Sequence, residues 1–260
     1  MQISDTHFGT EQPRVVEALI DFVRRIRPEI VVMSGDITQR ARSAQFAAAR
    51  RFVDRLAAPT IAIPGNHDIP LFNIPARVFH PYANYIRAFG SDLEPQWSTP
   101  FLHVVCVNTT RPARRKDGEV SKEQIARVCE RLRNATVRQL RVVVTHQPVH
   151  VIRARDNENL LHGSETAVHA WSRAGADIIM GGHIHLPYVR SLTDPRQNRR
   201  VWVVQAGTAV SRRVRGSIPN SVNVVRHSAQ HACRVERWDF DAHLNQFALH
   251  SEERLELDAR

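Results

Sequence analysis

The sequence predicts an α/β fold in which two mixed β-sheets pack face to face and helices flank them, an αββα sandwich. Up to residue 180, short apolar runs rich in β-branched residues alternate with amphipathic segments of helical period. After residue 186 the segments resemble strands joined by turns. A chain of 260 residues, 42% of them hydrophobic, is long enough to bury a core without disulfide bonds.

The first part of the chain is expected to supply five buried strands, at 29–33, 60–63, 101–107, 141–145 and 177–180. Four helices are expected between them. The first covers 15–26 with Thr10 as its N-cap, and the second follows Ser43 and runs to 56. The third begins at the capping box of Ser121 and Gln124, and the fourth covers 166–174. Residues 69–95 are rich in proline and aromatic side chains, and predict an irregular helical insertion beside any site.

The second part of the chain is expected to form a largely antiparallel second sheet. Its strands are predicted at 188–192, 201–206, 221–226, 233–240 and 246–257. We find no internal repeat and no linker, so residues 1–260 are expected to form a single domain. Residues 227–260 would then complete or extend the second sheet.

Charge and composition narrow the class of protein. Lys and Arg number 36 against 26 Asp and Glu, which gives a net charge of +10 and agrees with an anionic substrate. Only Lys116 and Lys122 are lysines and the basic residues are spread along the chain, so a nucleic-acid partner is possible but not favoured. No apolar run approaches the ~20 residues of a membrane span, and the opening MQISDTHFGT does not have the pattern expected of a signal peptide. Three scattered cysteines predict free thiols and a cytoplasmic location.

Polar residues gather directly after five of the predicted strands. These five clusters are Asp5–Thr6–His7, Gly35–Asp36, Gly65–Asn66–His67–Asp68, His146 and Gly182–His183–Ile184–His185. In sheets with helical crossovers, sites form at the carboxyl ends of strands, so the clusters are expected to meet at one edge. His183 and His185 would point the same way, because alternate residues of an extended segment share a face.

This set of ligands has a chemical meaning. Carboxylate, imidazole and amide oxygen without thiolate suit divalent metals such as Mn, Fe and Zn. These side chains offer more ligand atoms than one ion needs. An aspartate that bridges two ions would hold them about 3.5–4 Å apart, which is the arrangement used for hydrolysis of phosphate esters.

The motifs D-x-H, GD, GNHD, a lone His after a strand and GHxH, in this order over residues 3–226, resemble the calcineurin-like metallophosphoesterase superfamily. The start ISDTHFG and the segment GTAVSRRVRG…PNSVNVV are similar to bacterial class III cyclic-nucleotide phosphodiesterases. The resemblance implies the calcineurin-like metallophosphoesterase fold and two divalent metal ions per chain. It also implies a phosphodiesterase of the cytoplasm.

The resemblance also implies a role for each motif residue. Asp5, His7 and His185 would hold the first metal, Asp36 would bridge both, and Asn66, His146 and His183 would hold the second. His67 would not be a ligand; it would act on the scissile phosphate as a general acid or a hydrogen-bond donor, and Asp68 would orient it. Members of the superfamily usually begin with a longer strand than the four residues that precede Asp5, so we expect either a very short first strand or a start that lies upstream.

Substrate contacts are less sharply indicated. His150 follows His146 by four residues on the same loop, and Arg212, Arg213 and Arg215 could grip a phosphate with their guanidinium groups. A solvated loop is the alternative for the arginines. Residues 108–111 end another strand and would line the pocket.

The predicted function is hydrolysis of small phosphodiesters, with cyclic nucleotides as the first candidate substrates. A nuclease or a phosphomonoesterase on the same metal core is the alternative, and a non-catalytic scaffold with the same fold is the least favoured. A homodimer is possible.

Overall fold

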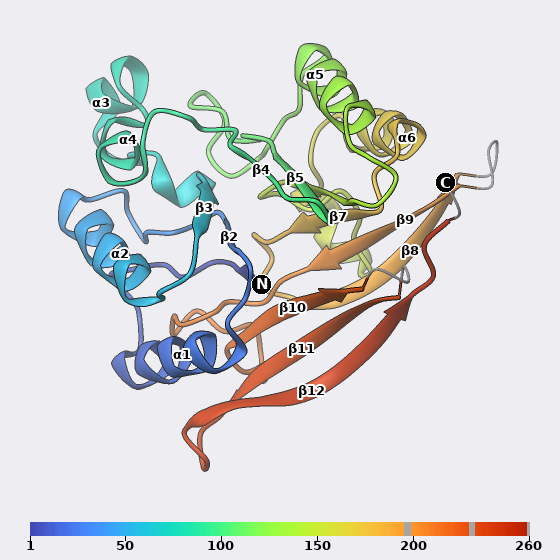
Figure 1. The fold of residues 1–260 in the computed structure, drawn as a ribbon. Helices are drawn as coiled ribbons and strands as arrows, with labels where there is room; N and C mark the ends of the chain where they lie inside the picture. Colours follow the sequence, from blue (N-terminus) through green and yellow to red (C-terminus); the bar gives the residue numbers. More distant parts are fainter. Residues whose placement is uncertain (195–198, 229–231, 259–260) are drawn as a thin grey trace.

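The computed structural model describes residues 1–194, 199–228 and 232–258. Two six-stranded mixed sheets form the centre of the molecule, and helices cover their outer faces (Figure 1), which confirms the predicted fold class. Along the first sheet the strands are ordered β12 (Gln246–Leu255), β11 (Cys233–Asp241), β10 (Ser221–His227), β1 (Gln2–Ile3), β2 (Val31–Ser34) and β3 (Thr60–Ile63). Along the second sheet the order is β4 (Gln96–Ser98), β5 (Leu102–Cys106), β6 (Leu140–Val144), β7 (Ile178–Gly181), β9 (Arg199–Gln205) and β8 (Tyr188–Asp194).

Apolar side chains from both sheets pack in one layer between them. Val32 and Ile63 of the first sheet belong to the same buried cluster as Val142, Met180 and Val204 of the second. Burial on both faces explains why the central strands are continuous apolar runs and do not alternate with polar residues.

Two pairs of helices cover the outer faces. Helices α1 (Pro13–Ile26) and α2 (Ser43–Arg55) pack on the first sheet, where Leu19 and Phe52 share a buried cluster with Ile3 and Met33. Helices α5 (Lys122–Arg133) and α6 (Ser164–Ala174) pack on the second sheet. Two shorter helices, α3 (Ile74–Phe79) and α4 (Ala83–Phe89), occupy the predicted insertion. Within the described residues, no helix combines the length and the hydropathy that crossing a bilayer requires.

The strands after residue 186 do not form a sheet of their own, and this prediction was wrong. β8 and β9 join the sheet of β4–β7, and β10–β12 join the sheet of β1–β3. Two-residue β1 lies between β2, to which it is parallel, and β10, to which it is antiparallel. Hydrophobic period identifies a strand but carries no information about a partner distant in sequence, so it could not divide these strands between the sheets.

Two predicted helix starts were also displaced, and one was correct. α1 begins at Pro13 with Gln12 as N-cap, because proline suits the first helical position, and Thr10 instead hydrogen-bonds the carbonyl of His7. α2 begins at Ser43, with Arg42 as its N-cap. The predicted capping box of α5 is confirmed: Ser121 accepts a hydrogen bond from the backbone of Gln124 at 3.2 Å, and the Gln124 side chain accepts one in return at 3.1 Å.

The short β1 is fixed by side-chain hydrogen bonds that reach both sheets. Gln2 is fully buried, and its amide donates to Ser34 Oγ and to the carbonyl of Gly181 at the end of β7. Beyond β1, the backbone of Asp5 and of His7 bonds to the loop that follows β2. The segment that carries the first polar cluster is therefore held in place despite the length of its strand.

Candidate metal centre

The five polar clusters meet at one edge of the two sheets, as predicted. Each follows the carboxyl end of a strand: Asp5 and His7 follow β1, Asp36 follows β2, and the others follow β3, β6 and β7. The side chains form three groups of metal-ligand type. Two of them have no residue in common, and the third, which consists of His7, Asp36 and His67, overlaps both.

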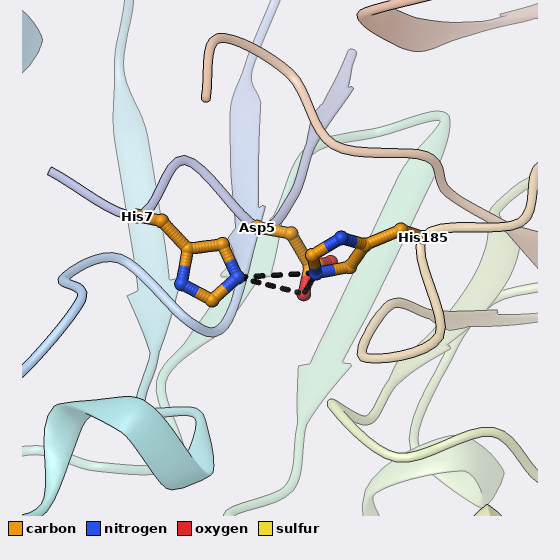
Figure 2. Close-up of side chains that lie close together, drawn as sticks. All are labelled: Asp5, His7 and His185. Atoms are coloured by element: carbon orange, nitrogen blue, oxygen red, sulfur yellow. Dashed lines mark hydrogen bonds and ion pairs between the residues drawn. The ribbon is translucent and has the colours of Figure 1, made fainter. Parts of the chain in front are cut away.

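The first group consists of Asp5, His7 and His185, all buried, whose ligand atoms lie within 4.8 Å of one another. The Nε2 atoms of the two histidines face each other at 3.1 Å (Figure 2). Asp5 Oδ1 lies 3.8 Å from His7 Nε2 and 3.2 Å from His185 Nε2. Three ligand atoms from two segments distant in sequence thus converge on one point.

The second group consists of Asp36, His146 and His183, again with ligand atoms within 4.8 Å of one another. His146 Nε2 lies 3.2 Å from Asp36 Oδ1 and 3.2 Å from the amide oxygen of Asn66. The other ring nitrogen of His146 lies 2.9 Å from the carbonyl of Ser34, which fixes the orientation of the ring.

Asp36 connects the two groups through its two oxygens. Oδ1 faces His146 at 3.2 Å, and Oδ2 faces His7 Nε2 at 3.7 Å. The carboxylate is 1% exposed. An aspartate with one oxygen toward each group has the geometry that a bridging ligand requires.

Burial and mutual charge shift the pKa values of these groups in opposite directions. Burial lowers the pKa of His7 and of His183 to about 3. Burial also opposes the charge on His146, but the Asp36 carboxylate raises the pKa of that imidazole to about 9. Burial acts to raise the pKa of Asp5, and the positive charge of His185 brings it below the ordinary value. Burial also acts to raise the pKa of Asp36, and the positive charge of His146 brings it well below the ordinary value.

The backbone that carries these residues is strained. Five residues of the two groups have positive φ, the left-handed region that non-glycine residues rarely adopt: Asp5 at 53°, His7 at 43°, Asp36 at 49°, His183 at 71° and His185 at 53°. Such conformations cost of order 1–3 kcal/mol each and concentrate at functional sites.

Two glycines allow the loops to approach closely. A Cβ at Gly182 would lie 2.5 Å from Asp5 Oδ2, and a Cβ at Gly65 would lie 2.2 Å from Asp36 Oδ1. Any side chain at either position would displace a carboxylate of the centre.

The residues present fit a pair of divalent ions. Carboxylate, imidazole and amide oxygen atoms converge without a thiolate, and at least one of the two imidazole nitrogens that face each other at 3.1 Å carries no proton and offers a lone pair to a metal ion. His183 Nδ1 is buried and has no hydrogen-bond partner within the described part of the chain. Buried polar atoms are normally satisfied, and a metal ion would satisfy these nitrogens.

The His67 ring is oriented by a backbone group. His67 Nδ1 lies 2.9 Å from the carbonyl of Gln39. Asp68 is buried and accepts hydrogen bonds from the backbone of Gly65, Ile37 and Thr38. The orienting role of Asp68 stays a prediction: its carboxylate accepts from backbone donors of two loops and from the Thr38 hydroxyl, and among the described hydrogen bonds none joins it to the His67 ring. Asp68 therefore fixes the turn that carries His67. Burial and the charge of Asp36 raise the pKa of Asp68 to about 6.

A cavity of about 530 Å³ opens onto the centre, and we call it the metal cavity. Asp36, His183, Arg213 and Arg215 are among the residues that line it. Arg213 donates to Gln39 Oε1 at 3.1 Å, and its carbonyl lies 2.5 Å from His185 Nδ1.

Other predicted substrate contacts have different positions. Arg215 forms two hydrogen bonds, of 2.7 and 3.0 Å, to the carboxylate of Asp156, so it is already paired. Arg212 and His150 are not among the lining residues, and their predicted contact with substrate stays a prediction. Residues 108–111 are also absent from the lining; there, the hydroxyl of Thr109 accepts a hydrogen bond from the backbone of His146 at 3.4 Å.

Sequence reasoning missed two polar residues of this lining, Lys116 and Asn159. Lys116 stands in a run of basic residues, RPARRKD at 111–117, and that run was the available signal. Asn159 lies in a 3₁₀ turn, Ala154–Asn159, and nothing in its local sequence marks it.

Comparison with known proteins agrees with this geometry. A family model described as calcineurin-like phosphoesterase matches residues 1–187. A probable cyclic nucleotide phosphodiesterase of Synechococcus sp. is 24% identical over 176 residues, which cover 66% of this chain and 64% of that protein. The glycerophosphodiester phosphodiesterase GpdQ of Enterobacter lignolyticus is 35% identical over 77 residues, which cover 25% of this chain and 28% of that protein. The aligned residues thus span less than two thirds of the length of either relative.

Solved structures share the fold. A dimetal phosphatase from Danio rerio matches with a TM-score of 0.62 and 14% identity, over 99% of this chain and 98% of that chain. The purple acid phosphatase PPD1 from yellow lupin matches with a TM-score of 0.73 and 13% identity, over 99% of this chain and 53% of that chain.

Proposed function

The chain belongs to the calcineurin-like phosphoesterase family, and we propose that it is a phosphodiesterase that uses two divalent metal ions to hydrolyse small phosphodiesters. The observation that carries this proposal is the position of Asp36, whose two oxygens face two separate groups of ligand atoms. A shared carboxylate between two sites is the arrangement that in-line displacement at phosphorus uses.

We assign the ligands by group. Asp5, His7 and His185 would hold one ion, Asn66, His146 and His183 would hold the other, and Asp36 would contact both. Mn, Fe and Zn fit this set of donors. When bound, the ions supply positive charge that activates water and offsets the charge of the phosphoryl oxygens.

His67 is assigned to the leaving group. It lines the metal cavity, and its Nδ1 is directed at the carbonyl of Gln39, so Nε2 is the ring nitrogen left for the substrate. With a proton on Nε2, His67 donates to the oxygen of the departing alcohol as the bond to phosphorus breaks. Asp68 keeps the turn in position through its backbone hydrogen bonds.

The choice of a phosphodiester rests on the relatives. One is described as a probable cyclic nucleotide phosphodiesterase and the other as a glycerophosphodiester phosphodiesterase. Both descriptions name diesters of small alcohols, and cyclic nucleotides are accordingly the first substrates to test. Arg213 in the lining of the metal cavity supplies a guanidinium for a phosphoryl oxygen.

The test combines metal analysis of the purified protein with a substrate panel. The panel contains 3′,5′-cyclic nucleotides, bis(4-nitrophenyl) phosphate, 4-nitrophenyl phosphate and single-stranded DNA. The proposal expects two ions per chain and a higher kcat/KM on diesters than on the monoester. A protein that binds two ions and hydrolyses none of the four would support the scaffold alternative, and a preference for the monoester would support a phosphomonoesterase.

Salt dependence separates a nuclease from an enzyme for small diesters. A nuclease that contacts about 6–10 phosphates loses affinity by about 10³–10⁵-fold between ~50 and ~200 mM salt, whereas a small diester offers one phosphate and its kcat/KM changes little. A steep loss on DNA, combined with a higher kcat/KM on DNA than on any small diester, would favour the nuclease.

A further inference from the structure

A second cavity, of about 670 Å³, adjoins the metal cavity and shares Asn66, His67 and Lys116 with it. We call it the side cavity. It is also lined by Gln39–Arg40 and by residues 113–117, which we call its two walls, and by the apolar residues Ile69 and Leu71, which we call its floor. Whatever occupies the side cavity lies against His67, the residue assigned to the leaving group.

A buried arginine joins the floor of the side cavity to one of its walls. Arg77, which is 8% exposed, donates from its guanidinium to the carbonyls of Pro70, Pro112 and Arg114 at 2.7–3.0 Å. Pro70 lies between the two floor residues, Arg114 belongs to the wall at 113–117, and Pro112 directly precedes that wall. The position of this wall relative to the floor is thus fixed by three hydrogen bonds from one cation.

The side cavity carries more positive charge than the nearby carboxylates neutralise. Arg114 pairs with Glu119 at 2.8 Å, and Lys116 pairs with Glu158 at 3.1 Å. Arg40 and Arg115 line the cavity, and neither forms an ion pair with a carboxylate within the described ranges.

The remaining charges do not cancel these two. Arg77 donates to carbonyl oxygens only, and burial and the charge of Arg115 lower its pKa. Asp117 is the one carboxylate among the described lining residues. Arg40 is exposed, and its guanidinium lies 5.4 Å from the centre of the Phe72 ring, which is 79% exposed.

We propose that the side cavity binds a phosphate group carried by the leaving alcohol, so that the preferred substrates are phosphodiesters in which one of the two alcohols is itself phosphorylated. This inference rests on the proposed phosphodiesterase activity and names its substrate class. The phosphodiester would lie at the metal cavity, the alcohol would pass His67 over the apolar floor, and its terminal phosphate would meet Arg40 and Arg115. Guanidinium groups bind phosphate through charge-assisted and often bidentate hydrogen bonds.

The reaction balances with water as the only co-reactant. Oxygen from water forms a bond to phosphorus, and the bond from phosphorus to the oxygen of the phosphorylated alcohol breaks with its electron pair. That oxygen takes a proton and leaves as a hydroxyl. The products are two phosphate monoesters, of which one carried its phosphate from the start.

Three thymidine dinucleotides test the proposal: TpT, pTpT with a 5′-phosphate, and TpTp with a 3′-phosphate. The phosphorylated half is expected to be the one that leaves as the alcohol. pTpT should then give only thymidine 5′-monophosphate, and TpTp only thymidine 3′-monophosphate. We also expect kcat/KM to be about tenfold higher for at least one phosphorylated dinucleotide than for TpT, the gain of a charge-assisted contact. Products are separated by anion-exchange chromatography.

Arg40→Gln, Arg115→Gln and the double variant test the assignment to these side chains. Each is expected to reduce the ratio of kcat/KM for pTpT or TpTp to that for TpT, and the double variant should bring it close to one. Arg173→Gln, an exposed arginine of α6, is the matched control and should keep the wild-type ratio. A ratio of metal ions to chains equal to that of the wild type establishes that each variant is folded at its centre.

The outcomes separate the two proposals. Release of thymidine with pTp from either phosphorylated dinucleotide would overturn the side-cavity assignment, as would a ratio near one for both in the wild type. Either result, with hydrolysis of bis(4-nitrophenyl) phosphate retained, leaves the phosphodiesterase proposal intact. No hydrolysis of any diester by the metal-loaded protein would overturn the proposed function itself.

Discussion

The Nε2 atoms of His7 and His185 face each other at 3.1 Å, and both face Asp5 Oδ1. At most one proton fits between two such nitrogens, so in the metal-free protein one ring must accept from the other. The burial of His7, whose pKa falls to about 3, favours its neutral form. The lone pair of a neutral His7 and the Asp5 carboxylate then face the same region, and a divalent cation placed there would interact favourably with both.

Metal binding is therefore expected to stabilise the folded chain strongly. At a free Mn²⁺ concentration of about 100 times the dissociation constant, the free energy of unfolding should rise by about 2.7 kcal/mol. For a chain of this size this corresponds to an increase in Tm of roughly 5–10 °C, measured by calorimetry. An unchanged Tm, with wild-type activity, would contradict a metal site at this position.

Asp36→Asn is expected to remove metal and activity together. The variant loses the negative charge of the carboxylate that faces both groups of ligands. Its metal content should therefore fall below two ions per chain, and kcat/KM should fall by at least about 10²-fold. Metal analysis and diester hydrolysis measure the two effects. Asp54→Asn removes an exposed carboxylate paired with Arg50 on α2, and should change neither. An Asp36→Asn protein with two ions would disprove the bridging assignment.

The free energy of unfolding of the metal-free protein is expected to depend on pH through the proton on His146. Its pKa in the folded state, about 9, lies above the ordinary value of 6.5. The stability from this proton, about 3 kcal/mol, is therefore fully present below pH 6.5 and is lost as the pH rises through 9. Unfolding in denaturant at several pH values, with chelator present, measures the loss.

Metal binding should show the opposite dependence on pH. A ligating imidazole must be neutral, so His146 releases its proton when an ion binds. The apparent affinity is expected to rise by up to about tenfold per pH unit between 6.5 and 9. Competition with a chelating dye measures it. His150→Gln, outside the metal cavity, should keep this slope, and a slope of zero in the wild type would contradict the pairing of His146 with Asp36.

The centre could be predicted from the sequence to a greater extent than its surroundings. Asp36 and His146 each follow a buried apolar strand, and the edge where parallel strands end is a property of the fold, so local pattern was sufficient. The partner of the His67 ring could not be predicted. It is a backbone carbonyl, at Gln39, and any residue carries one.

The side cavity could not be predicted from local sequence pattern either, although three of its basic residues are consecutive, at 114–116. Their position depends on Arg77, which binds carbonyls 7 to 37 residues away in the sequence. The strands after residue 186 are divided between the two sheets by contacts of the same kind, which join residues distant in sequence. Pairing of β1 with β10 joins residues 221 positions apart, at Gln2 and Asn223.

Breaking the pair of Arg215 and Asp156 is expected to loosen the loop of the two histidines. Arg215 joins this buried carboxylate to the carbonyl of Ile184, which lies between His183 and His185. Asp156→Ala should reduce the free energy of unfolding by about 3 kcal/mol, because it leaves a cation without its partner. It should also weaken metal binding. Asp54→Ala breaks an exposed pair and should cost no more than about 0.5 kcal/mol. An equal loss of unfolding free energy in Asp156→Ala and Asp54→Ala would contradict the proposed role of Asp156 in fixing the loop.

His67→Ala separates a proton donor from a ligand. The ring belongs to a group with His7 and Asp36 whose ligand atoms lie within 4.8 Å, so geometry alone permits coordination. If His67 acts as a general acid, the variant keeps both ions. General acid help is worth typically about 10²–10⁴-fold, and most where the leaving group is poor.

The loss should therefore be large on a cyclic nucleotide, whose leaving ribose oxygen needs a proton, and far smaller on bis(4-nitrophenyl) phosphate, whose nitrophenolate leaves without one. The alkaline limb of the pH profile on the cyclic nucleotide should also disappear, because that limb reports loss of the donated proton. Equal losses on both substrates would make His67 a hydrogen-bond donor to the phosphoryl oxygens. A loss of one ion would make it a ligand, and the assignment of the Asn66–Asp68 turn would then be wrong. Gln39→Ala is the matched control: the carbonyl that orients the ring is part of the backbone, so this variant should keep the difference between the two substrates.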